Sequence, residues 1–206
     1  MSRCAGQLFI LSGPSGSGKD TVLKLLLQQD SNLFLSISSI TRGMRQGEVN
    51  GEKYNFISRE LFESMLQKDA FLEHNVYLGN YYGTPRLPVE ENLAKGKDVI
   101  LEIDVNGANK VRKICPDAVS IFIMPLSFAE LKRRLVGRGT EEPAVIEKRL
   151  AQAIEEIRQA YAYDYIIIND ALDKAVQDLQ SVIVGERCKI KRNKYIIDEV
   201  LEDVES

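Results

Sequence analysis

The sequence predicts an α/β fold in which helices flank a parallel sheet. Short and almost continuous apolar runs recur at residues 8–11, 99–103, 119–123 and 165–168, and the stretches between them carry apolar residues at helical spacing. Such runs are typical of parallel strands that are buried on both faces. A chain of 206 residues is long enough for one sizeable core with inserted lobes, rather than for two independent domains.

The first apolar run leads into a glycine-rich segment, Gly13-Pro14-Ser15-Gly16-Ser17-Gly18-Lys19-Asp20-Thr21, and then into a helical stretch. The spacing G-x-x-x-x-G-K is that of a loop whose backbone N–H groups surround a phosphate, assisted by the dipole of the following helix. Lys19 is then placed to reach the β- and γ-phosphates of a nucleotide. The alternative is a glycine-rich turn that only joins a strand to a helix.

Asp20 stands where such loops usually carry Ser or Thr, whose hydroxyl binds Mg²⁺. Two unit charges about 4 Å apart repel by roughly 4 kcal/mol at an effective dielectric constant near 20, unless a metal lies between them. Asp20 can therefore be an oxygen ligand of Mg²⁺, directly or through water. It can equally be a carboxylate that the helix dipole stabilises, and the sequence leaves both interpretations open.

The segment between the first helix and residue 99 has a different character. Its strand-like runs, 34–38, 54–57 and 72–78, are short, polar and separated by glycines. This pattern predicts an inserted, turn-rich β lobe. A second insertion is expected at 127–157, where arginines are spread over helical sequence around Gly137 and Gly139, and it can form a mobile flap.

The charge and cysteine content exclude several classes of protein. A net charge of -3 argues against a general nucleic-acid or membrane surface. The three cysteines, Cys4, Cys115 and Cys188, are widely spaced and include no Cys-x-x-Cys pair, so neither a disulfide framework nor a zinc site is expected. We expect a cytoplasmic protein without a signal peptide, because the chain passes directly into its first strand and no apolar run approaches the ~20 residues of a membrane span.

Four further motifs follow the phosphate loop in order: residues 38–56, 79–85, 103–107 and 137–140. Together they resemble the guanylate kinases, a family of P-loop nucleoside monophosphate kinases, over residues 8–185. The resemblance implies a P-loop NTPase core, an inserted mixed α/β GMP-binding lobe and a helical lid. It also implies an enzyme of purine nucleotide metabolism that transfers the γ-phosphoryl group of ATP to GMP, giving ADP and GDP, with Mg²⁺ as cofactor. We expect dGMP to be accepted as well, since no residue obviously requires the ribose 2′-hydroxyl.

The resemblance divides the chain into six segments. Residues 1–37, 89–126 and 158–185 are expected to form the core, residues 38–88 the GMP-binding lobe, residues 127–157 the lid, and residues 186–206 a tail of unknown role.

GMP presents a dianionic phosphate at one end and a purine edge rich in donors at the other. Arg42 and Arg45 lie three residues apart and can both reach one phosphate, and the hydroxyls of Tyr54 and Tyr82 can complete its surroundings. A carboxylate can accept hydrogen bonds from guanine N1–H and its exocyclic amine. By resemblance the GMP-binding residues are Ser38, Arg42, Arg45, Tyr54, Glu73, Tyr82, Thr84, Glu102 and Asp104. Taken alone, the arginines could be solvated, the tyrosines ordinary strand residues, and Glu73 a side chain that faces solvent.

Phosphoryl transfer needs positioning and charge neutralisation more than covalent help. By resemblance Lys19, Arg134, Arg138 and Arg149 are catalytic and surround the ATP phosphates, whereas Arg133 and Lys148 are expected to face solvent. ATP is expected to bind residues 13–21 together with Asn169, which resembles the adenine-side residue of the family.

Asp20 also raises an alternative, because Gly-Lys-Asp-Thr resembles the related ribose 1,5-bisphosphate phosphokinases. A catalytically silent interaction module of the same fold is a second alternative, although such modules lose the loop lysine and the lid arginines. The tail beyond Gly185 is basic at 189–194 and acidic with apolar residues at 195–206, a spacing that suits an amphipathic helix. It could dock on its own core, pair with a second subunit or stay disordered, so monomer and homo-oligomer both remain open.

Overall fold

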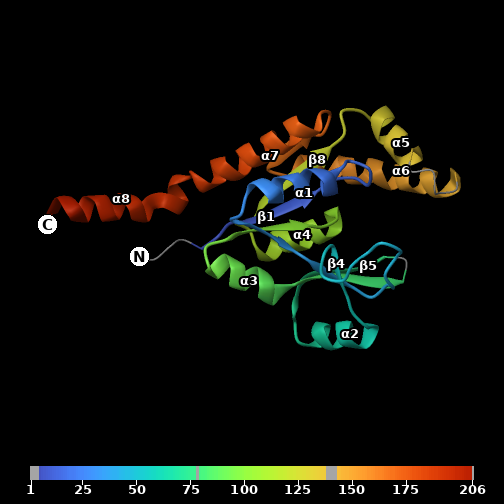
Figure 1. Cartoon of the computed structure of the whole chain (residues 1–206), viewed down its shortest axis with the longest axis horizontal. Helices are drawn as coiled ribbons and strands as arrows, with labels where there is room; N and C mark the ends of the chain where they lie inside the picture. Colours follow the sequence, from blue (N-terminus) through green and yellow to red (C-terminus); the bar gives the residue numbers. More distant parts are fainter. Residues whose placement is uncertain (1–4, 78, 138–142, 206) are drawn as a thin grey trace.

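The computed structural model describes residues 5–77, 79–137 and 143–205 (Figure 1). Within these residues, five parallel strands form the core sheet in the order β2-β7-β1-β8-β9. The strands are β1 (Leu8–Ser12), β2 (Leu33–Ser36), β7 (Asp98–Glu102), β8 (Val119–Met124) and β9 (Tyr165–Ile168). The parallel sheet with flanking helices that the apolar runs predicted is therefore confirmed.

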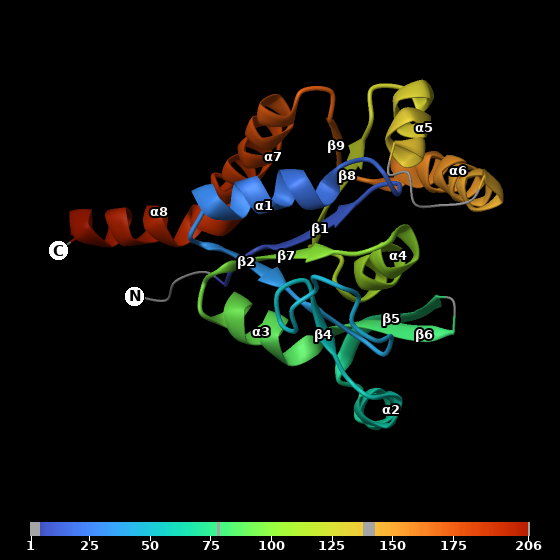
Figure 2. The same cartoon turned by 45° about the vertical axis from the view of Figure 1, so that its right-hand side comes forward.

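Strand β1 shows why these runs are almost continuously apolar. All of its residues are buried, and alternate side chains enter the apolar clusters on opposite faces of the sheet. Phe9 and Leu11 pack with α1 (Lys19–Gln29) and α7 (Leu172–Arg187). Leu8 and Ile10 pack with α3 (Arg86–Ala94) and α4 (Val105–Ile114) on the other face (Figure 2).

A second sheet lies beside the core and has the order β4-β3-β6-β5. Its strands are β3 (Ser38–Ile40), β4 (Tyr54–Phe56), β5 (Phe71–Tyr77) and β6 (Asn80–Pro85), with α2 (Arg59–Gln67) between β4 and β5. The ring of Phe62 on α2 stacks on Phe71, with ring centroids 4.3 Å apart. A Cβ at Gly83 would lie 2.8 Å from a ring carbon of Phe71 and 2.9 Å from the ring of Phe62, so only a glycine lets α2 pack so closely.

The strand-like pattern alone grouped residues 34–37 with the inserted lobe, and this is wrong, whereas the division by resemblance kept them in the core. Strand β2 pairs in parallel with β7 and lies at one edge of the core sheet, and the second sheet begins only at Ser38. The run Leu33–Ser36 is short, and its two middle residues are only partly buried, because β2 has a neighbour on one side only. Of the predicted strand 72–78, the last residue lies outside the described residues.

Helices α5 (Phe128–Val136) and α6 (Pro143–Arg158) have an apolar cluster of their own, formed by Leu131, Leu135 and Ala153. The 3₁₀ helix η1 (Gln159–Ala162) leads from α6 back to β9. The lobe and lid boundaries remain predictions.

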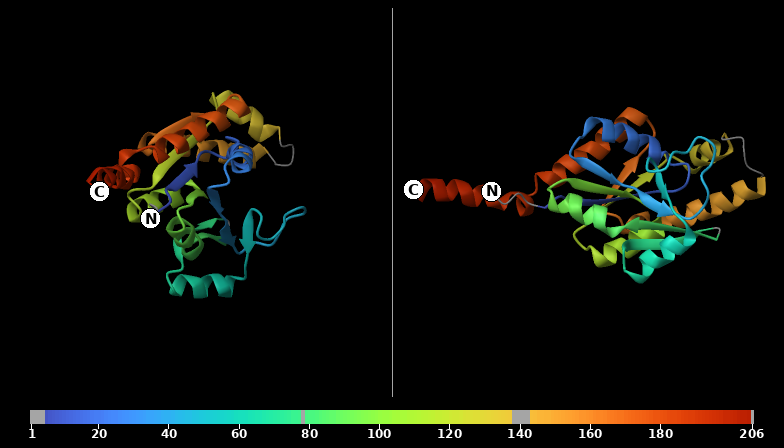
Figure 3. Two further views of the ribbon diagram at one scale, coloured as in Figure 1. Left: turned by 60° about the vertical axis from the view of Figure 1, so that its left-hand side comes forward. Right: turned by 60° about the horizontal axis from the view of Figure 1, so that its bottom comes forward.

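The tail forms helix α8 (Ile190–Glu205), which follows α7 and extends away from the two sheets (Figures 1 and 3). Within the described ranges, no helix combines the length and the apolar character that crossing a membrane requires.

Candidate active site

The phosphate loop connects β1 to α1 at the carboxyl end of the core sheet. Gly13, Gly16 and Gly18 all have positive φ angles, of 152°, 88° and 86°. A Cβ at Gly13 would lie 2.1 Å from the carbonyl oxygen of Ile123, and a Cβ at Gly18 would lie 2.4 Å from the Asn169 amide nitrogen. The loop therefore packs so tightly against the ends of β8 and β9 that these two positions accept only glycine.

Lys19, the first residue of α1, bends back over this loop. Its Nζ donates a hydrogen bond to the carbonyl oxygen of Gly13 at 2.7 Å. Burial lowers the pKa of Lys19, while the nearby carboxylates of Glu102 and Asp20 act in the opposite direction. A desolvated amine at the mouth of a loop of N–H groups is suited to hold a phosphate oxygen.

Asp20 lies in the first turn of α1 and contacts two charged groups. It forms an ion pair with Lys53, the residue that directly precedes β4 of the second sheet. It also shares a hydrogen bond with Glu102 at the end of β7. Burial alone would raise the pKa of Asp20, but the hydrogen bond from Glu102 and the Lys53 ammonium lower it. Burial and Asp20 together raise the pKa of Glu102, so Glu102 holds the proton between the two carboxyl groups.

Two of the predicted arginines and Asn169 meet at the same loop. Arg134 on α5 donates to the carbonyl oxygens of Ser17 at 3.3 Å and Asn169 at 3.0 Å. The Asn169 amide donates to the Ser17 carbonyl at 2.8 Å, and Arg149 on α6 donates to the Ser15 hydroxyl. The tertiary fold thus places two guanidinium groups beside the phosphate loop.

The other predicted lid residues lie elsewhere. Arg138 is outside the described residues. Arg133 pairs with Glu130 and has a side chain that is 74% exposed, and Lys148 is exposed as well. These two match the expectation of solvated side chains.

In the second sheet, Arg42 is held by a carboxylate that the sequence reasoning missed. Its two terminal nitrogens donate to the two carboxylate oxygens of Glu48, both at 2.6 Å. The backbone N–H of Arg45 donates to the same carboxylate at 2.7 Å, whereas the Arg45 side chain is exposed. Hydrogen bonds from Arg42 and Arg45 lower the pKa of Glu48 to about 2.

Aromatic rings surround the Arg42 guanidinium. Its central carbon lies 5.6 Å from the centre of the Tyr54 ring and 5.3 Å from that of Phe56. Tyr82 hydrogen-bonds to Arg42, and the Tyr82 and Tyr54 rings meet edge to face at 6.4 Å. The fold therefore brings Arg42, Tyr54 and Tyr82 together, with Ser38 at the position opposite Tyr54 in the β3–β4 pairing.

Glu73 faces inward, although strand alternation alone would turn it to solvent. It is 7% exposed, and its carboxylate accepts a hydrogen bond from the Thr84 hydroxyl at 2.7 Å. The pairing of β5 with β6 shifts register between Phe71 and Glu73, and this irregularity breaks the simple alternation. Burial raises the pKa of Glu73, although the hydrogen bond from Thr84 lowers it in part.

Asp104 lies close to Glu73 and caps the amino end of α4. Its carboxylate accepts from the Gly107 N–H at 2.7 Å and from the Asn75 amide at 3.2 Å. A Cβ at Gly107 would lie 2.8 Å from a Glu73 carboxylate oxygen. The polar side chains of Glu73, Thr84 and Asp104 therefore lie close together between the two sheets.

Besides Glu48, sequence reasoning missed Lys53 and Glu156. Glu156 on α6 accepts a hydrogen bond from the Ser15 backbone and another from the Gln152 side chain at 2.8 Å. Burial raises the pKa of Glu156. Glu48 could have been found from its place in the same glycine-rich segment as the two arginines, but nothing local marks Lys53 or Glu156.

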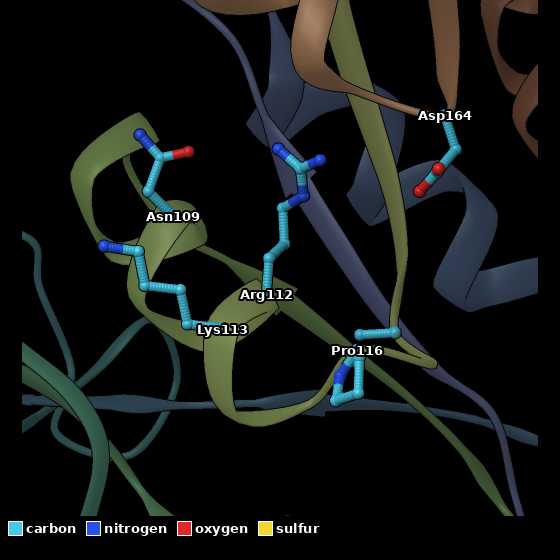
Figure 4. Close-up of a pocket in the computed structure, with 6 residues that line it drawn as sticks. Asn109, Arg112, Lys113, Pro116 and Asp164 are labelled. Carbon is cyan, nitrogen blue, oxygen red and sulfur yellow. The ribbon is translucent and has the colours of Figure 1, made fainter.

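A cavity of about 490 Å³ lies away from these groups (Figure 4). Its lining residues are Asn109, Arg112, Lys113, Pro116, Ala118 and Asp164. Ala118 and Asp164 directly precede β8 and β9, so the cavity opens at the amino edge of the sheet, opposite to the phosphate loop. It does not contribute to the site described above.

The chain has clear relatives among known proteins. A family model described as guanylate kinase matches residues 5–186. The chain is 46% identical over 198 residues to a guanylate kinase of Clostridioides difficile (strain 630), covering 96% of this chain and 97% of the relative. It is 49% identical over 190 residues to a guanylate kinase of Carboxydothermus hydrogenoformans, covering 92% of this chain and 93% of the relative.

The solved structures agree with these matches. A crystal structure of guanylate kinase from Anaplasma phagocytophilum superimposes with a TM-score of 0.77 at 35% sequence identity. That match covers 93% of this chain and 92% of the other chain.

Proposed function

The chain belongs to the guanylate kinase family and transfers the γ-phosphoryl group of ATP to GMP, and from this premise we propose which of its residues carry out the reaction. The observation that supports the assignment most strongly is the convergence of Lys19, Arg134 and Arg149 on the phosphate loop. We set aside the two alternatives from the sequence, a ribose 1,5-bisphosphate phosphokinase and a catalytically silent interaction module. The near full-length relatives reported above are guanylate kinases.

On the ATP side, Lys19 neutralises the β- and γ-phosphates, and Arg134 and Arg149 stabilise the charge that builds up on the transferred group. Each of these arginines already donates to the loop, so phosphate oxygens would replace contacts to Ser15 and Ser17. Asn169 contacts the loop and Arg134, and it lies on the adenine side.

Asp20 would hold Mg²⁺, whereas Glu102, which lies beside it and carries the shared proton, stays with the proposed GMP-binding residues. The two carboxyl groups share a hydrogen bond beside the loop, and carboxylate oxygens are the ligands that Mg²⁺ prefers. Within the described residues no cluster of three or more metal-binding side chains occurs, which fits a cation that takes its remaining ligands from water and nucleotide phosphates. When bound, the cation would neutralise phosphate charge.

On the GMP side, Arg42, Arg45, Tyr54 and Tyr82 bind the phosphate, and Glu73 accepts hydrogen bonds from the guanine edge. Ser38, Thr84 and Asp104 complete the base side, with Thr84 holding the Glu73 carboxylate in place. The same set accepts dGMP, because none of these groups is assigned to the ribose 2′-hydroxyl.

We also propose a cytoplasmic location, which is supported by the use of ATP as co-substrate.

Substitution of Glu73 tests whether this residue recognises the guanine base. Glu73→Ala is expected to lower kcat/KM for GMP and to leave the low activity with AMP unchanged, so that the GMP preference falls by about tenfold to a hundredfold. ADP release with ATP and Mg²⁺ is measured with GMP, dGMP, AMP and UMP as acceptors. Glu52→Ala, which removes an exposed carboxylate of the same lobe, is the control. An unchanged ratio of GMP to AMP turnover would show that Glu73 does not read the base.

Glu48 is proposed as a positioning residue for the GMP phosphate. Arg42 has five N–H donors, and three of its hydrogen bonds go to Glu48 and to the Gly43 carbonyl. Arg42 also hydrogen-bonds to the Tyr82 hydroxyl. The guanidinium is therefore held in a fixed orientation, in which its remaining N–H donors can bind a phosphate. The Glu48 carboxylate also closes the loop onto the Arg45 backbone, so both arginines depend on it.

Glu48→Gln is expected to raise KM for GMP by about tenfold to a hundredfold, because the amide no longer holds the guanidinium through two charged hydrogen bonds. KM for ATP should not change, and Glu48→Asp should recover part of the loss. Steady-state kinetics with each nucleotide varied measures this, with Glu52→Gln as the matched control. Tighter GMP binding in Glu48→Gln would mean that Glu48 competes with the phosphate instead of positioning Arg42.

A further inference from the structure

Lys53 reaches from the second sheet to the helix that follows the phosphate loop, and it has no part in the roles proposed above. It directly precedes β4, and its ammonium forms an ion pair with Asp20, 33 residues away along the chain in the first turn of α1. The side chains of Lys53 and Asp20 are 48% and 59% exposed, so the pair is open to an incoming ligand. Lys53 is therefore an accessible cation where the second sheet meets the core.

The groups around Lys53 belong to both halves of the site. On the core side, Lys19 and Glu102 lie close enough to interact with its charge. On the other side, its ammonium is 5.9 Å from the centre of the Tyr54 ring, and the central carbon of the Arg42 guanidinium lies 5.6 Å from the same centre. Lys53 therefore lies between the lysine proposed to hold the γ-phosphate of ATP and two residues proposed to hold the phosphate of GMP.

An ion pair that only stabilises the fold does not account for a lysine at this position. Exposed pairs contribute about 0–1 kcal/mol to stability, so the contact with Asp20 holds the second sheet against the core only weakly. The stronger demand is electrostatic, because the phosphates of the two nucleotides have to approach each other. Two unit charges about 4 Å apart repel by roughly 4 kcal/mol at an effective dielectric constant near 20. A cation between them offsets this repulsion.

The chemistry of an ammonium group allows Lys53 to contact Asp20 and a phosphate at the same time. A lysine has three N–H donors at the end of a flexible stem, and an ion pair with a carboxylate leaves donors unused. Asp20 holds the ammonium beside the phosphate loop before the nucleotides arrive. This contact lowers the entropy cost of ordering a long side chain when the phosphates bind.

We propose that Lys53 is a further catalytic residue, whose ammonium binds oxygens of the phosphoryl group as it passes from ATP to GMP. The inference rests on the proposed function, in which that group lies between Lys19 on one side and Arg42 and Tyr54 on the other. An oxygen of the dianionic GMP phosphate forms a bond to the γ-phosphorus while the bond from this phosphorus to the β,γ-bridging oxygen breaks, and ADP leaves with the electron pair. No proton moves, so Lys53 stays charged and offsets the charge on the transferred oxygens throughout.

The first experiment removes the charge of Lys53 and keeps most of the length of its side chain. Lys53→Met is expected to lower kcat by about tenfold to a hundredfold, with KM for ATP and for GMP nearly unchanged, and Lys53→Arg should recover part of the loss. Lys68→Met, which changes an exposed lysine at the end of α2, is the matched control and should keep wild-type kinetics. A wild-type kcat in Lys53→Met, while Lys19→Ala and Arg42→Ala lose activity, would overturn this inference and leave the proposed function standing.

A second experiment separates this role from a contact that only supports Asp20. Lys53→Met is expected to lower kcat by about tenfold in the Asp20→Asn background as well, because the ammonium acts on the phosphoryl group and not only on the carboxylate. Calorimetry gives a readout that needs no turnover. An analogue in which a polyphosphate chain joins adenosine to guanosine should bind about tenfold more weakly to Lys53→Met, whereas GMP alone should bind as in the wild type.

Two outcomes of the second experiment would contradict the proposal. One is that Lys53→Met causes no further loss of kcat once Asp20 is changed, which would make Lys53 a support for Asp20 alone. The other is an unchanged affinity for the analogue, which would show that the ammonium does not touch the phosphates between the two nucleosides.

Discussion

Replacing Lys19 with alanine is expected to abolish phosphoryl transfer, with kcat lowered by about a thousandfold or more while GMP still binds. The Lys19 ammonium is buried at the mouth of the phosphate loop, where it donates hydrogen bonds to the carbonyl oxygens of Gly13 at 2.7 Å and Pro14 at 3.4 Å. Its charge is worth most in such a desolvated place, because little water competes with the phosphate. Without it, the charge that develops during transfer loses its nearest fixed cation.

The measurement is ADP release at saturating GMP, together with calorimetric binding of each nucleotide. Lys24→Ala is the control, since Lys24 lies on the same helix with an exposed side chain. An equal loss of ATP and GMP binding in Lys19→Ala would show that the substitution disturbs the fold and not the transfer.

Replacing Arg42 with alanine is expected to raise KM for GMP by about a hundredfold and to leave KM for ATP nearly unchanged. Two physical effects add here. The phosphate loses a guanidinium, and the Glu48 carboxylate, with a side chain that is 22% exposed, is left without its partner beside an incoming anion.

The second effect can be separated from the first. Glu48→Gln in the Arg42→Ala background should recover part of the GMP affinity, because it removes the unpaired negative charge, whereas it weakens binding when Arg42 is present. KM for GMP in the four proteins of this cycle gives the coupling between the two side chains. Lys68→Ala controls for loss of an exposed positive charge in the same lobe. Unchanged GMP affinity in Arg42→Ala would remove Arg42 from the phosphate site.

The apolar runs and the glycine spacing were sufficient to predict the parallel core sheet and the phosphate loop. Local rules were sufficient to predict β1, the phosphate loop and α1, because a buried parallel strand, a loop of N–H groups and an amphipathic helix each leave a short and distinct pattern. The resemblance supplied the site residues that have no such pattern of their own, Glu73 above all. The roles of these residues stay predictions until the variants are measured.

Where the sequence prediction failed, contacts between distant segments decided the result. Residues 34–37 form a short run next to the glycine-rich segment and were grouped by pattern with the inserted lobe, yet Leu33–Ser36 pairs with β7 as an edge strand of the core. Glu73 turns inward because β5 shifts register against β6, an irregularity that depends on how two strands meet. Neither result can be read from the residues on one strand.

The sequence by itself determined four of the core strands, at 8–11, 99–103, 119–123 and 165–168, the phosphate loop with Lys19, and the amphipathic character of the tail. Only the tertiary structure brought Lys53 to Asp20, Glu156 to Ser15 and Arg42 to Glu48, and only it directed α8 away from the core. The physical reason is one of range. Backbone geometry and apolar periodicity act over a few residues and leave their pattern in the chain, whereas the partner of a charged side chain depends on which segments pack together.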